Sequence, residues 1–256
     1  MKQIDSGAKT TEKSLAIVDA LVELDGATID ELADHLGMAP STVHRHLVTL
    51  REHNYVRAEK GEYHIGLQFL TKGGYAQRRV TGFAHIKQKV DGLAERTGER
   101  AQFIVREGGE RVYLYTEVGE SAVQTGAHIG KRGAIHTSAA GKAILAALPR
   151  EDIEEIIDVH GLPQKTANSI TDRDALDAEL EEIRERGYAV NKQETTKGVH
   201  AVGAVVTDSE GVPVGGLSVS GPANRVREDR IHDELPDLIL AAVNELELYI
   251  AHAVEP

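Results

Sequence analysis

The stretch TIDELADHLGMAPSTVHRHLVTLREHNYV, residues 28–56, has the pattern of two short helices joined by a tight turn. Thr28 followed three residues later by Glu31 is the capping-box signature of a helix start. Gly37 is expected to end this first helix in the left-handed conformation. A further helix is expected just before this stretch, over residues 11–24, with a core-facing side made of Leu15, Val18, Leu21 and Val22.

The second helix of the pair is expected over residues 40–53, because Pro40 suits a first helical turn, where its missing N–H group costs no hydrogen bond. Its apolar residues recur at helical spacing, which predicts a buried stripe of Val43, Leu47 and Leu50. Hydroxyl groups on the other face suit phosphate contacts, and an arginine fork suits a guanine edge in the major groove. We therefore predict a DNA-reading helix, with a solvated helix face as the alternative; its candidate contacts are Ser41, Thr42, His44, Arg45, His46 and Thr49.

Two short strands are expected directly after this helix, within YVRAEKGEYHIG, residues 55–66. Gly61 supplies the positive φ that a tight hairpin turn requires. A hairpin in this position is typical of the wing of a winged helix-turn-helix. Arg57 and Lys60 are predicted to touch the DNA backbone, although plain solvated charges are the alternative. Residues 67–80 are expected to form a connecting helix and hinge.

The net charge of the chain, −12, is unfavourable for binding a polyanion, but the charge is unevenly distributed. Residues 1–79 hold 10 basic and 11 acidic side chains, whereas the remainder holds 19 basic and 30 acidic ones. The segment from Met38 to Arg51 contains no acidic residue. Salt screens charges beyond about 8–10 Å, so the local charge matters more than the total. The predicted helix pair is therefore compatible with DNA binding.

The composition limits the class of protein. A chain of 256 residues with 41% apolar residues is long enough for two domains, or one large one. The absence of cysteine excludes disulfides and thiolate sites. No apolar run approaches the ~18 residues that span a bilayer, and the polar N-terminus lacks a signal-peptide core, so a cytoplasmic location without a membrane partner is expected. The acidic composition is compatible both with a salt-adapted cytoplasm and with an ordinary protein of pI near 5.5.

The C-terminal part alternates helices with hairpins rather than forming regular βαβ units, which indicates an α+β domain. Strands are expected at residues 101–106, 112–116, within 121–130, and at 187–193, 200–208 and 212–220. Helices are expected at residues 83–97, from 137 or 138 onward, at 151–159, at 172–186 with Thr171 as the cap, and at 227–253.

Three motifs together resemble the IclR family of bacterial and archaeal transcription regulators. They are STVHRHLVTL at residues 41–50, IHTSAAGKAILA at 135–146, and GYAVNKQETTKGVHAVGAVVTDSEGVPVGGLSVSGP at 187–222. The resemblance extends over nearly the whole chain. It implies a winged helix-turn-helix at residues 1–66, a linker helix at 67–80, and a GAF-like effector domain with a curved, mostly antiparallel sheet at 81–256. It also implies dimers or tetramers that bind double-stranded DNA at palindromic operators.

The same resemblance implies an effector pocket in the C-terminal domain. Position by position, its contacts are the backbone groups of Ala139 and Ala140 together with Asn191, Ala201, Ser218 and Ser220. Backbone N–H groups at a helix start attract a carboxylate, and serines two apart on a strand share a face. Asn191 replaces a commonly acidic residue, and Ala201 cannot donate a hydrogen bond. A small organic acid is the expected ligand class; alternatively, the two serines only line a tight sheet.

Two other functions are weighed against this one. A hydrolase would need Ser218 or Ser220 with His200 and Asp208, but no G-x-S-x-G turn is present, so no enzyme is expected. A metal site could form from His128, His136 and His200 if they converge, although no H-x-x-x-H pair occurs. No cofactor is expected. The alternative that remains is a C-terminal domain serving as an oligomerisation or metal-linked module without an organic ligand.

Overall fold

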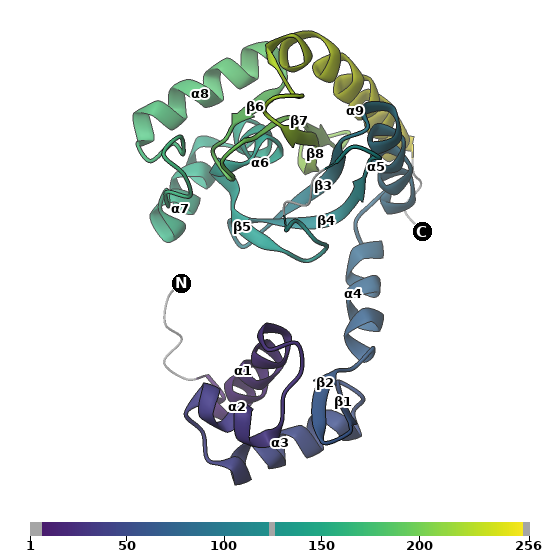
Figure 1. The fold of residues 1–256 in the computed structure, drawn as a ribbon. Helices are drawn as coiled ribbons and strands as arrows, with labels where there is room; N and C mark the ends of the chain where they lie inside the picture. The colour runs from purple at the N-terminus through teal and green to yellow at the C-terminus, as the bar shows by residue number, and fades with distance from the viewer. Residues whose placement is uncertain (1–6, 123–125, 253–256) are drawn as a thin grey trace. The chain divides into compact units, whose positions relative to one another are not determined.

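The computed structural model describes residues 7–122 and 126–252. The chain divides into two compact units, residues 1–79 and 80–256, each of which is described by itself (Figure 1). The first unit, called the headpiece below, contains α1 (Lys9–Glu23), α2 (Ile29–Leu36), α3 (Pro40–Glu52), β1 (Val56–Glu59), β2 (Glu62–Ile65) and α4 (Gln68–Arg78).

The helix pair of the headpiece forms as its sequence predicts. The Thr28 hydroxyl accepts a hydrogen bond from the backbone N–H of Glu31 at 3.3 Å, and the Glu31 carboxylate accepts one from the backbone N–H of Thr28 at 2.8 Å. This capping box is confirmed, as is the left-handed Gly37 with φ 61°. On α3, Val43 and Leu47 are fully buried against the other helices. The winged helix-turn-helix is therefore present.

The predicted core-facing side of α1 is wrong in part. The buried residues are Ile17, Ala20 and Leu21, whereas Leu15 is 56% exposed and Val22 is 65% exposed. Apolar residues surround α1 on several sides, so the spacing alone did not identify the side that packs. An apolar strip of α1 consequently remains exposed on the headpiece.

The second unit is an α+β domain built on a six-stranded sheet. The strands run in the order β5-β4-β3-β8-β7-β6, and every neighbouring pair is antiparallel. Its strands are β3 (Arg100–Glu107), β4 (Glu110–Val118), β5 (Arg132–Ala134), β6 (Ala189–Lys192), β7 (Val199–Thr207) and β8 (Pro213–Pro222). Its helices are α5 (Phe83–Thr97), α6 (Ala139–Ala146), α7 (Arg150–His160), α8 (Arg173–Arg186) and α9 (Leu235–His252).

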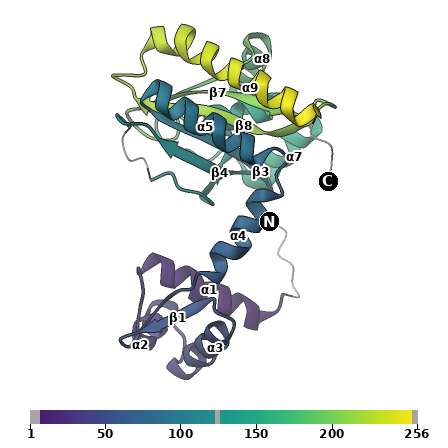
Figure 2. The same ribbon diagram turned by 90° about the vertical axis from the view of Figure 1, so that its right-hand side faces the viewer.

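Helices cover both faces of this curved sheet, and each face has its own hydrophobic core. Figure 2 shows α5 and α9 side by side over one face, where Phe103, Leu217 and Val219 are fully buried. On the other face α6 lies against β7 and β8 and is backed by α8 (Figure 1). The core there includes Ile144 and Leu180. The α+β prediction with an antiparallel curved sheet is therefore confirmed.

Three predicted elements are misplaced. The strand expected within residues 121–130 is found at Arg132–Ala134; of the predicted range, residues 123–125 lie outside the described part of the chain. Asp172 rather than Thr171 caps α8, since its carboxylate accepts a hydrogen bond from the N–H of Ala175 at 3.0 Å. The last helix contains a π-helical turn at Arg230–Glu234, followed by α9.

No helix in the described residues is long and apolar enough to cross a membrane.

Candidate functional site

The first candidate surface lies on α3 and is locally cationic. Pro40 occupies the first turn of the helix, and the burial of Val43 and Leu47 fixes which side faces outward. The residues left exposed on the outer side are Ser41, His44, Arg45 and Thr49. The guanidinium of Arg45 has no carboxylate within 4 Å among the described residues. This exposed fork at the N-terminal half of a helix has the chemistry that reads a base edge.

Thr42 and His46 are only half-exposed, on the flank of α3. The His46 Nδ1 lies 2.8 Å from the Ser14 hydroxyl of α1. Burial, followed by the positive charges of Lys13 and Arg45, lowers the pKa of His46, so its ring is neutral at pH 7. His46 thus helps to hold α3 against α1. Lys13 is an additional cation near this surface that the sequence pattern did not reveal.

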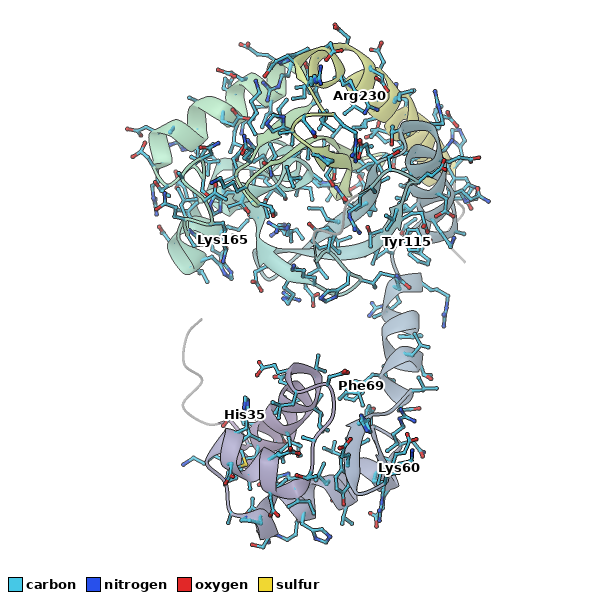
Figure 3. The ribbon with its side chains drawn as sticks, viewed as in Figure 1. His35, Lys60, Phe69, Tyr115, Lys165 and Arg230 are labelled. Carbon is cyan, nitrogen blue, oxygen red and sulfur yellow. The ribbon has the colours of Figure 1, made fainter. Side chains whose placement is uncertain are left out.

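The wing is a tight hairpin with a basic residue at its tip. Lys60 and Gly61 form the two-residue turn with φ values of 52° and 93°, so a non-glycine residue takes one of the left-handed positions. The Lys60 side chain lies exposed at the end of the hairpin (Figure 3). Arg57 on β1 is paired with Glu59 at 3.1 Å, and both are exposed. Lys60 is therefore the freer of the two wing cations.

The second candidate site is a cavity of about 70 Å³ between the sheet and the start of α6. Six of its lining residues are those that the family resemblance implies, namely Ala139, Ala140, Asn191, Ala201, Ser218 and Ser220. The others are Gln102, Ile104, Arg111, Tyr113, Ala127, Lys131, Ser138, Thr195, Thr196 and Val199. Two of the sixteen lining side chains are cationic, and none is acidic. The cavity therefore suits an anion.

The start of α6 lies directly on the sheet because two strand positions are glycines. A Cβ at Gly203 would be 2.7 Å from the backbone nitrogen of Ala140, and one at Gly216 would be 2.8 Å from its carbonyl oxygen. The Ser138 hydroxyl caps the helix by accepting from the N–H of Gly141 at 3.1 Å. The N–H groups of Ala139 and Ala140 have no partner within the helix, as at any helix start. They give this wall of the cavity a positive electrostatic potential.

The two serines are linked through a glutamine that sequence reasoning missed. Gln102 on β3 lies opposite Ser218 in the sheet register, and its amide donates to the Ser218 hydroxyl at 2.8 Å. The Ser220 hydroxyl donates to the Gln102 carbonyl oxygen at 3.3 Å. The three side chains form one polar row on the face that α6 covers, as the two-residue alternation of strands requires. This row can exchange its internal hydrogen bonds for bonds to a ligand.

Asn191 holds the segment that leads into α6. Its amide donates to the Thr137 carbonyl at 2.7 Å and to the Thr195 hydroxyl at 3.1 Å, while its oxygen accepts from the N–H of Glu194 at 2.8 Å. The side chain is therefore engaged on both sides. Ala201 faces the same cavity and adds an apolar surface.

A buried ion-pair cluster lies behind the cavity. The ammonium group of Lys142 on α6 contacts Glu194 at 2.8 Å and Glu179 at 3.0 Å, and the residue is 1% exposed. Burial raises the pKa of Glu194, and the adjacent Lys142 opposes that effect. The cluster ties α6 to α8 and to the segment after β6. It therefore fixes the position of the helix start that lines the cavity.

Two family models match this chain, the "IclR helix-turn-helix domain" over residues 10–60 and "Bacterial transcriptional regulator IclR C-terminal" over residues 79–248. The second covers more than half of the chain. The chain belongs to the IclR family of transcriptional regulators. It is a DNA-binding transcription regulator and not an enzyme.

Relatives of known description cover nearly the whole of this IclR-family protein. The "Probable HTH-type transcriptional regulator ArcR" of Halobacterium salinarum is 31% identical over 244 residues, covering 94% of this chain and 93% of the relative. The IclR crystal structure from Thermotoga maritima has a TM-score of 0.83 at 30% identity, covering 95% and 99% of the two chains. An IclR homolog from Microbacterium hydrocarbonoxydans, crystallised with 4-hydroxybenzoate, has a TM-score of 0.77 at 22% identity, covering 93% and 98%.

Neither the residues of a hydrolase site nor those of a histidine metal site come together in this IclR-family fold. His200 bonds through Nδ1 to the Val226 carbonyl, and Asp208 accepts backbone N–H groups in the β7–β8 turn, so neither contacts the cavity serines. His128 is exposed, and His136 lines a different cavity, beside α7. Among residues 7–122 and 126–252, no three potential ligands of the His, Asp or Glu type converge to hold a metal ion.

Four of the ten lining residues that the sequence did not predict lie on β3 and β4. Gln102 and Arg111 reach the cavity from strands more than seventy residues before the family motif at 187–222. No local pattern marks them, because their approach to Ser218 and to α6 depends on the strand order of the sheet. Lys131 lines the cavity from the segment before β5, and Thr195 lines it from the segment between β6 and β7.

Proposed function

We propose that this regulator is an effector-gated DNA switch, in which a small organic acid bound in the α6 cavity changes the affinity of the headpiece for its operator. The observation that carries the proposal is the cavity itself, lined by two cations, a helix start and a row of hydroxyl and amide groups, with no acidic side chain. Such a lining attracts a carboxylate. The 4-hydroxybenzoate bound to the Microbacterium hydrocarbonoxydans homolog is an organic acid, which supports this class.

Three parts of the chain have separate functions in this proposal. Residues 1–66 bind DNA, residues 67–80 form the linker, and residues 81–256 bind the effector. Because the effector binds one arrangement of the headpieces better than another, it shifts the population between them. A DNA-binding regulator acts where the DNA lies, so we propose a cytoplasmic location.

The DNA contacts are assigned by exposure. Arg45 reads a base edge in the major groove, and Ser41, His44 and Thr49 contact bases or phosphates beside it. Thr42 and His46 lie on the flank of α3, where Thr42 reaches a phosphate and His46 mainly positions the helix. Arg57 and Lys60 on the wing bind backbone phosphates.

The effector contacts are assigned by the cavity lining. The N–H groups of Ala139 and Ala140 and the hydroxyls of Ser218 and Ser220 bind the acid, with Asn191 and Ala201 shaping the cavity. Asn191 acts mainly through the Thr137 carbonyl that it holds.

A homodimer or tetramer is proposed because the headpiece leaves apolar side chains exposed that a second copy can cover. These are Leu67, directly before α4, Leu70 and Tyr75 on α4, and Leu15 and Val22 on α1. Two headpieces then engage a palindrome whose half-sites lie about 34–36 Å apart or a multiple of this. Analytical ultracentrifugation of the full chain should give an even-numbered oligomer; a monomer at micromolar concentration would refute this part.

The proposal is tested by removing the two serines together. Ser218→Ala with Ser220→Ala should leave DNA affinity unchanged without acid, because both residues lie in the C-terminal unit, and should remove the response to the acid. DNA binding is followed by fluorescence anisotropy over an acid titration. The matched control is Ser209→Ala in the exposed β7–β8 turn, which should respond like the unmodified protein. A normal response from the double variant would place the effector elsewhere.

A further inference from the structure

Arg111 is a buried cation without an anionic partner. The residue is 5% exposed, and no carboxylate of the described residues lies within 4 Å of its guanidinium. Its Nη1 donates to the Ala134 carbonyl at 2.5 Å and to the Thr137 hydroxyl at 2.9 Å, while its buried Nε has no hydrogen-bond partner there. A buried charge is unfavourable unless it is paired. An anionic ligand beside this guanidinium would supply the missing partner.

The position of Arg111 shows where that anion would lie. Arg111 and Tyr113 are two residues apart on β4 and both line the α6 cavity, with the guanidinium 5.8 Å from the tyrosine ring centroid. The Thr137 that Arg111 contacts is followed by Ser138, the cap of α6. The arginine on β4 therefore reaches the same cavity as the helix start and the serine row, whose Gln102 lies on the neighbouring strand β3.

Lys131 adds a second positive charge to the cavity lining. Its ammonium group donates to the Gly126 carbonyl at 2.7 Å and has no carboxylate within 4 Å among the described residues. None of the acidic side chains within residues 7–122 and 126–252 lines this cavity. A ligand with two negative charges would balance both cations.

We propose that the effector is a small dicarboxylate and that Arg111 binds one of its carboxylates through its fork. This inference rests on the proposed function, because it specifies the ligand of the same cavity. The second carboxylate lies at the start of α6 and the serine row, or against Lys131. A cavity of about 70 Å³, at roughly 10–15 Å³ for each water-sized atom, holds about five to seven such atoms, which favours malonate, with roughly seven heavy atoms, over the larger succinate. Arginine suits this task better than lysine because its fork matches a carboxylate in two hydrogen bonds.

The test compares acids of equal chain length in the full-length protein. Isothermal titration calorimetry with malonate and succinate is set against propanoate and butanoate, for the unmodified protein and for Arg111→Gln. The control is Arg132→Gln on the neighbouring strand β5, which removes the same charge from an exposed residue paired with Glu107 and Glu110. Glutamine retains one donor, and the ligand-free melting temperature of each variant verifies that it folds.

The dicarboxylates should bind at least about 10-fold more tightly than the monocarboxylates. Arg111→Gln should weaken their binding by about 10- to 100-fold, the range for a charge-assisted hydrogen bond, and leave the monocarboxylates less affected. Arg132→Gln should change neither. If Arg111→Gln fails to fold, Arg111→Lys replaces it; this variant keeps the charge but loses the fork, and should weaken dicarboxylate binding by about 10-fold.

Two other results would have different meanings. Equal affinity for both acid series, unaffected by Arg111→Gln but removed by the Ser218→Ala and Ser220→Ala pair, would overturn the role of Arg111 and leave the acid-gated switch intact. If neither series binds, while the protein still binds its upstream DNA, the dicarboxylate proposal is overturned; the acid-gated switch fails with it only if no acid in the anisotropy titration alters DNA binding.

Discussion

Arg45 is the side chain on which sequence-specific DNA contact depends. Its exposure on α3 means that Arg45→Ala should leave the fold intact. A bidentate arginine–guanine contact contributes about 1–3 kcal/mol of discrimination. The variant should therefore lose about 10- to 100-fold in affinity for the DNA upstream of its own gene, and much less for scrambled DNA, as measured by fluorescence anisotropy.

The control for Arg45→Ala is Arg96→Ala on α5, which removes one exposed positive charge from the C-terminal unit. It should leave both DNA affinities close to those of the unmodified protein. An Arg45→Ala variant that still binds the upstream DNA with full affinity would show that α3 reads the bases through other residues.

His136 gives a pH-dependent stability at the residue scale. Burial lowers its pKa to about 4 from the ordinary 6.5, so the folded protein keeps the ring neutral where the unfolded chain protonates it. The neutral His136 ring contributes up to about 3 kcal/mol to the free energy of unfolding. This contribution is complete above pH 6.5 and is lost as the pH falls toward 4.

Urea unfolding at pH 7.5 and 4.5 measures this loss. Over the same pH change, the free energy of unfolding of His136→Gln should fall by about 2 kcal/mol less than that of the unmodified protein, because the titrating group is gone. The exposed His128→Gln should behave like the unmodified protein. If the free energy of unfolding falls equally with and without His136, other groups determine the acid sensitivity.

Individual site residues could be predicted from the sequence only where a local pattern marks them. Ser218 and Ser220 were implied by the family resemblance, since they lie within the motif at residues 187–222, and both line the cavity. Gln102 and Arg111 reach the same cavity from β3 and β4, and only the register of the folded sheet brings them there. The partner of His46 was missed for the same reason, since Ser14 lies 32 positions earlier in the chain.

At the scale of elements, α6 is the structural centre of the effector site. Lys142 holds this helix through Glu194 and Glu179, so Lys142→Met leaves the buried Glu194 carboxylate without its cation, while Glu179 keeps Arg186 at 3.2 Å. Breaking a buried ion pair from one side typically costs about 3–5 kcal/mol. We expect a loss of that order in the free energy of unfolding, measured by urea denaturation at pH 7.5.

The double variant Lys142→Met with Glu194→Gln separates the ion pair from packing. Glu194→Gln removes the uncompensated buried charge, so the double variant should recover part of the stability that Lys142→Met loses. If Lys142→Met costs less than about 1 kcal/mol, the cluster does not hold α6 in place.

Helices and strands could be predicted from the sequence where capping residues mark their ends and the apolar spacing marks the side that packs. The capping box of α2 and its Gly37 end are local features, and both form; Val43 and Leu47 of the predicted stripe on α3 are likewise buried. The packed side of α1 was wrong because its apolar residues surround the helix, and the third strand was misplaced because β5 is only three residues long. The π-helical turn before α9 has no sequence signal that spacing alone would detect.

At the scale of the whole molecule, the uneven charge resolves the conflict between an acidic chain and DNA binding. The acid-free segment from Met38 to Arg51 contains almost all of α3, whereas most of the acidic residues lie beyond residue 79. The α+β class and the winged headpiece followed from element order and family motifs. The composition of the cavity, by contrast, depends on strands distant in sequence, so its positive charge became visible only in the folded domain.

The central claim is that acid binding in the C-terminal unit controls DNA binding by the headpiece. The most direct test is the affinity of the full-length protein for the DNA upstream of its own gene, measured by fluorescence anisotropy while small mono- and dicarboxylic acids are titrated at fixed salt. We predict saturable binding whose Kd shifts by about 5- to 150-fold, the usual range of allosteric coupling, with at least one acid. DNA binding of full strength that no acid alters at saturating concentration would contradict the claim.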